Sequence, residues 1–230
     1  MIIESYIDES RPISSGYLCQ KHHLAYSPAT VRNIMLELEQ RGYISHIHTS
    51  SGRVPTKEGF KHYVENIDEE KVARNCPEAP NVYPSPETTI PAIIDDTLDA
   101  LTSLSGYASL VAVSGPDARI FFKGMRFILE QPEFEDVHRL RNIFYLLEEK
   151  MDVLQTLLLG YIDDKVRIII GDDIGCSEFS DCSLVVSGLQ EKDITVALSI
   201  LGPMRMNYIR SISCLRLVTR QLKAIVEEIL

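Results

Sequence analysis

Arg32 and Asn33 are adjacent, and their side chains are suited to recognising another molecule. Arginine can donate two hydrogen bonds to a guanine edge or bind phosphates, and asparagine pairs with an adenine edge. Both lie in a segment with helix signals at each end. Ser27 is a good N-cap, Pro28 suits the first helical position, and Gly42 would end the helix in the left-handed conformation. The segment therefore predicts a recognition helix for DNA.

The predicted helix is amphipathic, which indicates which side chains face outward. Apolar residues recur at i, i+3, i+4 and i+7, and this stripe consists of Val31, Ile34, Met35 and Leu38. At 100° per residue, the opposite face carries Ala29, Arg32, Asn33 and Gln40. Because alanine is small, Ala29 would let the helix approach DNA closely. We expect base edges to be read by Thr30, Arg32 and Asn33.

A short hairpin, or wing, is expected directly after this helix. Residues 43–48 alternate as a strand does, and residues 49–53 form a polar tip that contains Gly52. Hydroxyl groups donate to phosphate oxygens, and an arginine can enter the minor groove. We expect phosphate or minor-groove contacts from Ser27, His48, Thr49, Ser50, Ser51, Arg53 and Lys57.

Upstream, residues 13–23 predict the first helix of a helix-turn-helix, and residues 24–26 predict the turn. The alternative is a helical hairpin of the kind found in many small domains. The adjoining wing and the polar face with Arg32 and Asn33 favour a winged helix-turn-helix that binds double-stranded DNA.

Composition and charge agree with a globular DNA-binding protein. The chain has 230 residues, of which 45% are hydrophobic and 24% charged. No apolar run is long enough to span a membrane, and the N-terminus does not have the pattern of a signal peptide. The cytoplasm is the expected location. The formal net charge is −10, yet residues 11–63 carry seven Lys and Arg against three acids. From residue 64 onward there are 16 Lys and Arg and 27 acids, so a basic head on an acidic body is expected.

The chain predicts three parts. Residues 1–66 form the DNA-binding domain, residues 67–92 a proline-rich, extended linker, and residues 93–230 a second domain. Helices are expected at 57–64, 93–104, 134–160 and 207–230. Strands are expected at 107–113, 120–122, 126–129, 165–170, 182–187 and 194–201. This order predicts an α+β class with a mainly antiparallel sheet.

Catalysis, a metal and a cofactor are not indicated. Asp172 and Asp173 follow a strand, but a third carboxylate on a neighbouring strand is not evident, so a strand-end turn is the better interpretation. Cys176 and Cys182 are six residues apart without a nearby histidine, and the five cysteines show no C-x-x-C spacing. Reduced thiols are expected, and the protein is not expected to be an enzyme.

Three sequence blocks resemble the HrcA family of heat-inducible transcription repressors. They are ATVRNIMLELEQRGYISHIHTSSGRVPTKEGFKHYVE at 29–65, QPEFEDVHRLRNIFYLLEEK at 131–150 and GPMRMNY at 202–208. The resemblance implies a winged-helix head, a GAF-like α/β body and a dimerising domain inserted in that body. It also implies a homodimer that binds the CIRCE inverted-repeat operator of chaperone operons, and the chaperonin GroEL as a partner that keeps the repressor active.

The chain departs from the family pattern in two places. Met1 falls within the family's first helix, which indicates a truncated N-terminal helix. The dozen residues 113–124 stand where the family carries its inserted dimerisation domain, so the chain resembles a short form of the repressor. Its dimer must then use the body itself, through the helix expected at 134–159 or the C-terminal helix.

Two other functions remain open at this stage. One is a winged-helix regulator that senses a small metabolite through the GAF-like body, since that fold often holds ligands. The other is a short paralogue that has lost DNA binding and serves as an interaction module.

Overall fold

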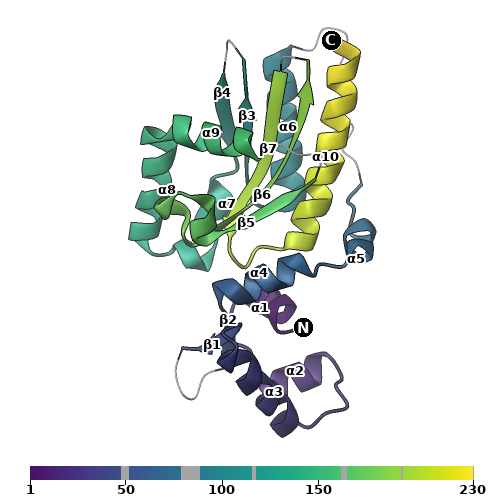
Figure 1. Ribbon diagram of the computed structural model, residues 1–230, viewed down its shortest axis with the longest axis vertical. Helices are drawn as coiled ribbons and strands as arrows, with labels where there is room; N and C mark the ends of the chain where they lie inside the picture. Colours follow the sequence, from purple (N-terminus) through teal and green to yellow (C-terminus); the bar gives the residue numbers. More distant parts are fainter. Residues whose placement is uncertain (48–51, 79–88, 116–117, 162–164, 193, 230) are drawn as a thin grey trace. The chain divides into compact units, whose positions relative to one another are not determined.

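The computed structural model describes residues 1–47, 52–78, 89–115, 118–161, 165–192 and 194–229 (Figure 1). The chain divides into two compact units. Unit 1 comprises Met1–Ile67 together with Met204–Asn207, and unit 2 comprises Asp68–Pro203 and Tyr208–Leu230.

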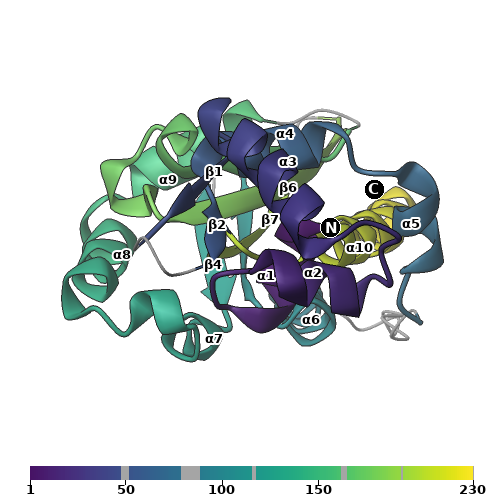
Figure 2. The same ribbon diagram turned by 90° about the horizontal axis from the view of Figure 1, so that it is seen from below.

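Unit 1 combines four helices with a short antiparallel hairpin, and Figure 2 shows α2 beside α3. Its elements are α1 (Ile2–Glu9), α2 (Ser15–Lys21), α3 (Pro28–Gln40), β1 (Ile44–His46), β2 (Arg53–Pro55) and α4 (Lys57–Glu65). The backbone of Ile13 pairs with that of Arg53, which adds a third short segment to the hairpin. A side chain at Gly52 would meet the Ile13 backbone at 2.5–2.8 Å, so this pairing requires glycine there.

The core of unit 1 determines which faces of α2 and α3 are buried. Ile13, Leu18, Val31, Met35 and Ile44 are buried together. They come from α2, α3, β1 and the segment before α2. Burial of such side chains is the main favourable contribution to folding, and here it holds the helix-turn-helix pair against the hairpin.

Unit 2 is built on a five-stranded sheet in the order β4-β3-β7-β6-β5. The strands are β3 (Ala108–Val113), β4 (Arg119–Lys123), β5 (Arg167–Ile170), β6 (Cys182–Glu191) and β7 (Ile194–Pro203). Every pairing is antiparallel. Val113 pairs with Arg119, so β3 and β4 are directly joined in the region where we expected an inserted domain to be missing.

Helices cover both faces of this sheet (Figure 1). On one face lie α6 (Ile90–Ser105) and α10 (Tyr208–Ile229), and on the other lie α8 (Val137–Glu149) and α9 (Met151–Gly160). The shorter helices are α5 (Glu69–Arg74), α7 (Arg126–Leu129) and the 3-10 turns η1 (Pro132–Phe134), η2 (Gly171–Ile174) and η3 (Ser177–Phe179). The prediction of an α+β class with an antiparallel sheet is confirmed.

The linker was predicted as extended over its whole length, and this is wrong for Glu69–Arg74, which form α5. Asp68 caps this helix, acids occupy its first turn and Arg74 its last, which are strong local helix signals. The prolines that suggested an extended chain all come after α5, and the last of them, Pro91, stands in the first turn of α6.

Two predictions for the middle of unit 2 are also wrong. Residues 126–129 form α7 rather than a strand, because a short apolar run does not distinguish the two. The single helix expected over 134–160 is divided into α8 and α9, since Lys150 leaves the helical conformation at φ −131° and ψ 31°. The Lys150 ammonium lies 2.6 Å from the Glu178 carboxylate, which stabilises this break.

The cysteines agree with the expectation of reduced thiols. Cys176, Cys182 and Cys214 are buried, Cys19 is partly buried, and Cys76 is exposed, all without disulfides. Burial raises the pKa of the Cys214 thiol to about 11, so it stays protonated at neutral pH. Among the described helices, none combines the length and apolar character needed to cross a membrane.

Candidate nucleic-acid interface

The outward face of α3 is set by two buried side chains. Val31 and Met35 are only 5% and 4% exposed and lie in the core of unit 1. With these two positions fixed inward, Arg32 and Asn33 must point outward, and both are exposed. Ile34 is 46% exposed, so its predicted place in the buried stripe is wrong. Ile34 lies at the edge of the apolar stripe, and no other described element of unit 1 covers it.

The first turn of α3 is capped as predicted. The Ser27 hydroxyl oxygen accepts a hydrogen bond from the Thr30 backbone N–H at 3.1 Å, and the two hydroxyl oxygens lie 2.9 Å apart. Pro28 occupies the first helical position, where its missing N–H is not needed. Ser27, Ala29 and Thr30 are all exposed, so this turn presents small and hydroxyl side chains next to Arg32 and Asn33.

The C-terminal end of α3 joins the hairpin through a left-handed glycine, as predicted. Gly42 has φ +79°. The N–H of Gly42 donates to the Glu39 carbonyl and that of Tyr43 to the Leu38 carbonyl, which is a Schellman motif. The Thr56 hydroxyl then donates to the Gly42 carbonyl at 2.6 Å. This bond ties the start of α4 to the end of α3.

Glu39 connects α3 to both strands of the hairpin. Its carboxylate pairs with His46 on β1 and with Arg53 on β2, where Arg53 Nη2 lies 2.8 Å from Oε2. His46 and Arg53 are register partners, so one side chain clasps both strands. Hydrogen bonds from His46 and then Arg53 hold the pKa of Glu39 below its usual value. Glu39 was not among the predicted site residues; its signal was an acid on α3 followed by two cationic residue types on adjoining strands.

The structure describes only some of the residues predicted to contact DNA from the wing. Arg53 is 18% exposed and paired with Glu39, so contact with DNA would require its guanidinium to serve both partners. Lys57 is partly buried at the first position of α4, after the N-cap Thr56. Four of the predicted contact residues lie outside the described residues: His48, Thr49, Ser50 and Ser51.

Several Lys and Arg side chains of unit 1 are paired with acids, so the head is less basic than expected. Lys21 lies 2.7 Å from Asp8 and Arg11 3.1 Å from Glu9. Over residues 1–67, seven Lys and Arg are balanced by seven Asp and Glu, because α1 adds acids that the segment 11–63 left out. Among the described residues, Arg32 on α3 has no acidic partner within 4 Å, so its charge is available on the exposed face.

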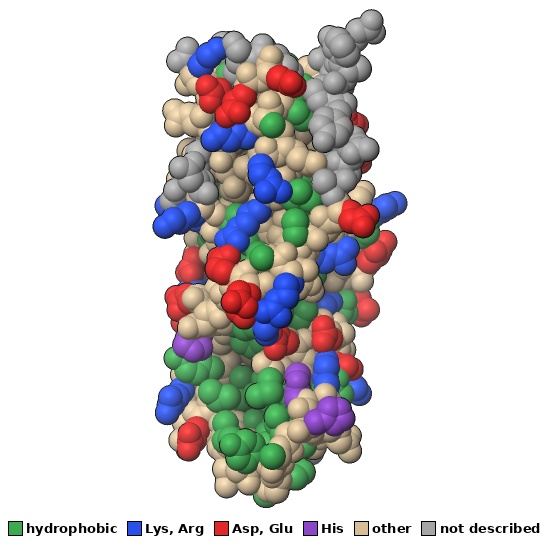
Figure 3. Space-filling view, turned by 90° about the vertical axis from the view of Figure 1, so that its right-hand side faces the viewer, with side chains coloured by type: hydrophobic (Ala, Val, Ile, Leu, Met, Phe, Trp, Pro, Cys, Tyr) green, Lys and Arg blue, Asp and Glu red, His purple; other side chains and the backbone are tan. Residues whose placement is uncertain are grey.

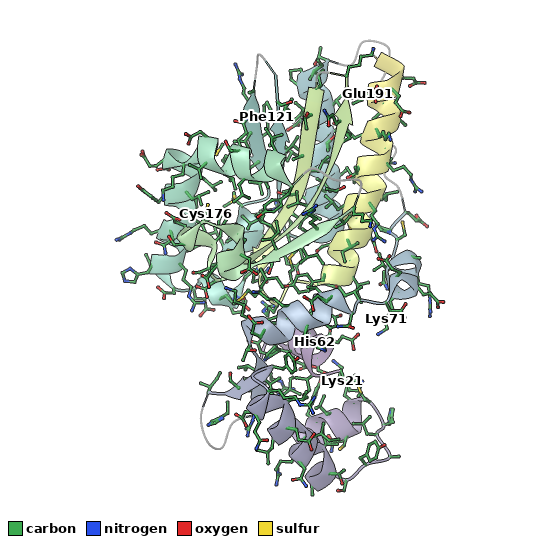
Figure 4. The ribbon with its side chains drawn as sticks, viewed as in Figure 1. Lys21, His62, Lys71, Phe121, Cys176 and Glu191 are labelled. Atoms are coloured by element: carbon green, nitrogen blue, oxygen red, sulfur yellow. The ribbon has the colours of Figure 1, made fainter. Side chains whose placement is uncertain are left out.

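Sticks for all described side chains are drawn in Figure 4, where Lys21 lies on α2 and His62 on α4. The His62 ring stacks on Tyr43, with 4.8 Å between the ring centroids. Groups of three or more His, Cys, Asp or Glu arranged to hold a metal are absent from the described part of the chain. The exposed side of α3 thus carries polar Arg32 and Asn33 as well as apolar Ile34 and Leu36, beside a clasped hairpin.

Relatives of this chain are named as transcription repressors. A protein from Desulforudis audaxviator named Heat-inducible transcription repressor HrcA is 23% identical over 338 residues, covering 99% of this chain and 96% of the relative. A protein of the same name from Desulforamulus reducens is 26% identical over 332 residues, covering 100% and 95%. Both alignments exceed the 230 residues of this chain, so the relatives contain residues that it lacks.

A solved structure supports the fold. The crystal structure of a hypothetical protein superposes with a TM-score of 0.78 at 17% identity, covering 97% of this chain and 94% of that one. Transcription repressors are the class of protein to which these relatives point. The model of the HrcA protein C-terminal domain matches residues 87–212, more than half of the chain. The chain belongs to the HrcA family.

Proposed function

We propose that unit 1 is a winged helix-turn-helix that binds double-stranded DNA, with α3 in the major groove. The observation that carries this proposal is the burial of Val31 and Met35, which turns Arg32 and Asn33 outward. Thr30, Arg32 and Asn33 would read base edges, while Ala29 permits close approach. Phosphate or minor-groove contacts are assigned to Ser27, His48, Thr49, Ser50, Ser51, Arg53 and Lys57.

The regulated genes follow from the family. We propose that the protein represses heat-shock chaperone operons by binding the CIRCE inverted repeat, and that GroEL keeps it active. It acts in the cytoplasm by binding rather than by catalysis, with unit 2 as a GAF-like body. The names of the relatives support heat-inducible repression.

An inverted repeat calls for two copies of the head, one on each half-site. We propose that the dimer forms through the exposed face of α8, which bears Val137, Phe144 and Tyr145, exposed by 66%, 41% and 50%. These residues recur along one side of the helix. A run of large apolar side chains in contact with water is typical of a protein interface.

The charges that flank this face fit a second copy of the chain. Arg141 and Glu148 are exposed on the same side of α8, at equal distances from the midpoint between Phe144 and Tyr145. In an antiparallel pair about a two-fold axis at that midpoint, Arg141 of one copy faces Glu148 of the other. The aromatic pairs then meet at the centre, and each ion pair is made twice.

A fluorescence-anisotropy titration tests the function. A labelled CIRCE duplex and a scrambled duplex of equal composition are titrated with the full chain at one salt concentration. We expect binding to the CIRCE duplex to be tighter by tenfold or more. Equal, weak binding to both duplexes would overturn the proposal of operator recognition, and sedimentation of the same samples would report whether a dimer had formed.

A further inference from the structure

Unit 2 contains a groove of about 560 Å³ between α10 and the strands β5 and β6. The volume falls within the range of small-molecule sites, which is about 300–1,000 Å³. The groove lies wholly within unit 2, on the side of the sheet edge formed by β5. In Figure 4, the labelled Glu191 marks the end of β6 next to α10.

Cationic side chains line the groove. Lys165 precedes β5, and Arg216, Arg220 and Lys223 follow one another on one side of α10 at i, i+4 and i+7. Figure 3 views the side of unit 2 that carries α10, and Lys and Arg side chains gather there. Within the described part of the chain, Glu191 is the one acid that lines the groove. The groove is therefore positively charged.

The positive charge of the groove contrasts with the negative net charge of residues 68–230. Residues 68–230 carry 16 Lys and Arg against 26 Asp and Glu, so cations gathered on one wall are not the average surface. Arg216 is already held by Glu69, with Nη2 and Oε1 3.0 Å apart. Lys165, Arg220 and Lys223 make no ion pair within 4 Å among the described residues. Unpaired cations around a concave site favour an anionic ligand.

A hydroxyl and an apolar wall complete the groove. The Thr219 hydroxyl oxygen is buried and has no hydrogen-bond partner among the described residues, although it lines the same groove. A buried polar atom without a partner costs free energy, which a ligand that bonded to it would recover. Val166, Leu189 and Val226 line the remaining wall and offer a surface for an uncharged group.

We propose that this groove binds a small organic phosphate. Its phosphate would lie against Arg220 and Lys223, since a guanidinium fork and an ammonium both donate to phosphate oxygens. Its uncharged body would lie along Val166, Leu189 and Val226. The site goes beyond the proposed repressor function, and its ligand is recognised without DNA.

Isothermal titration calorimetry on the full chain tests this site with two probes, inorganic pyrophosphate and adenosine diphosphate, at matched ionic strength. We expect saturable binding of both with one site per chain, and tighter binding of adenosine diphosphate, because only it has a body to cover the apolar wall. The variants Arg220→Gln and Lys223→Gln should each weaken both probes at least tenfold. Arg119→Gln, which removes an exposed cation on β4, is the matched control and should change affinity by less than twofold.

The melting temperature of each variant without ligand is measured first; both substituted side chains on α10 are exposed, so it should stay unchanged. Absence of saturable binding by either probe would overturn the proposal, as would equal weakening by Arg119→Gln. If Arg220→Gln and Lys223→Gln instead lower duplex affinity while pyrophosphate does not saturate, the groove binds a DNA backbone and the small-ligand site is refuted. Failure of the repressor function would show in the duplex titration and leave the calorimetry unaffected.

Discussion

Helices α3 and α8 are a matched pair with opposite surfaces. Both have 13 residues and a side-chain N-cap, Ser27 in α3 and Asp136 in α8. Each buries one stripe in the core of its unit. The exposed side of α3 begins with small, hydroxyl and amide groups around Arg32 and continues with Ile34 and Leu36, whereas that of α8 has Phe144 and Tyr145 at its centre.

The exposed surfaces of α3 and α8 suit different partners. Hydrogen-bonding groups that stand clear of the core match base edges and phosphates, which are polar and hydrated. Aromatic side chains pack well against another apolar surface, because the contact excludes water. A second copy of the same helix provides such a surface. We therefore propose DNA as the partner of one helix and a second subunit as the partner of the other, and substitutions on each should have separable effects.

The largest effect is expected from Phe144→Glu. Two buried carboxylates would face each other across the two-fold axis, so the dimer should dissociate at least tenfold more readily. Operator affinity should fall by at least as much, because a monomer places only one head on the inverted repeat. Sedimentation equilibrium and anisotropy measure the two quantities.

Phe122→Glu is the matched control for this change. Phe122 is an exposed phenylalanine on β4, 43% exposed against 41% for Phe144, and is outside the proposed interface. It should leave both quantities nearly unchanged. A Phe144→Glu protein that remains a dimer with full operator affinity would exclude α8 as the dimer surface.

Arg32→Ala should have the next largest effect. Losing a bidentate contact to a base costs about 1–3 kcal/mol of operator binding, or roughly five- to 150-fold in affinity. The oligomeric state should not change, because Arg32 is on α3. Anisotropy titrations at matched salt measure the loss, and unchanged affinity would remove Arg32 from the recognition surface.

Charge reversal on α8 tests the proposed antiparallel dimer, and its expected effect is smaller. Arg141→Glu alone should weaken the dimer, since it places two acids opposite each other; partly exposed ion pairs contribute up to about 1 kcal/mol each. Adding Glu148→Arg in the same chain should restore it. A double variant no better than the single one would show that the two residues do not face each other.

Lys57→Ala should have the smallest effect and a different signature. A phosphate contact carries no sequence information, so all duplexes should bind more weakly by a similar factor. The slope of log affinity against log salt should drop by about one unit. A loss confined to the operator would instead assign Lys57 to base recognition.

Much of the fold could be predicted from local signals. Ser27, Pro28 and Gly42 predicted the bounds of α3, and five of the six strands predicted for unit 2 correspond to β3–β7. The break at Lys150 could not be predicted, because the apolar spacing continues across it and the ion pair with Glu178 comes from a distant segment. Helix α5 was missed because the nearby prolines outweighed the cap at Asp68.

One apolar position predicted wrongly inside a helix stripe is informative. Periodicity assigned Ile34 to a buried stripe, yet it is exposed. A stripe shows which residues are apolar, but which of them are covered depends on the neighbouring elements. The clasp of Glu39 on His46 and Arg53 was likewise hidden, because it joins residues that only the turn after α3 brings together.

The most direct test of the central claim, that the outward face of α3 reads bases, is a base-by-base comparison. Wild-type protein and Arg32→Ala are titrated against a panel of CIRCE duplexes, each with one base pair changed. We predict that the variant becomes indifferent, within twofold, to one operator position in each half-site and keeps its discrimination at the others. The same discrimination profile for both proteins, or a wild-type protein that discriminates at no position, would contradict the account.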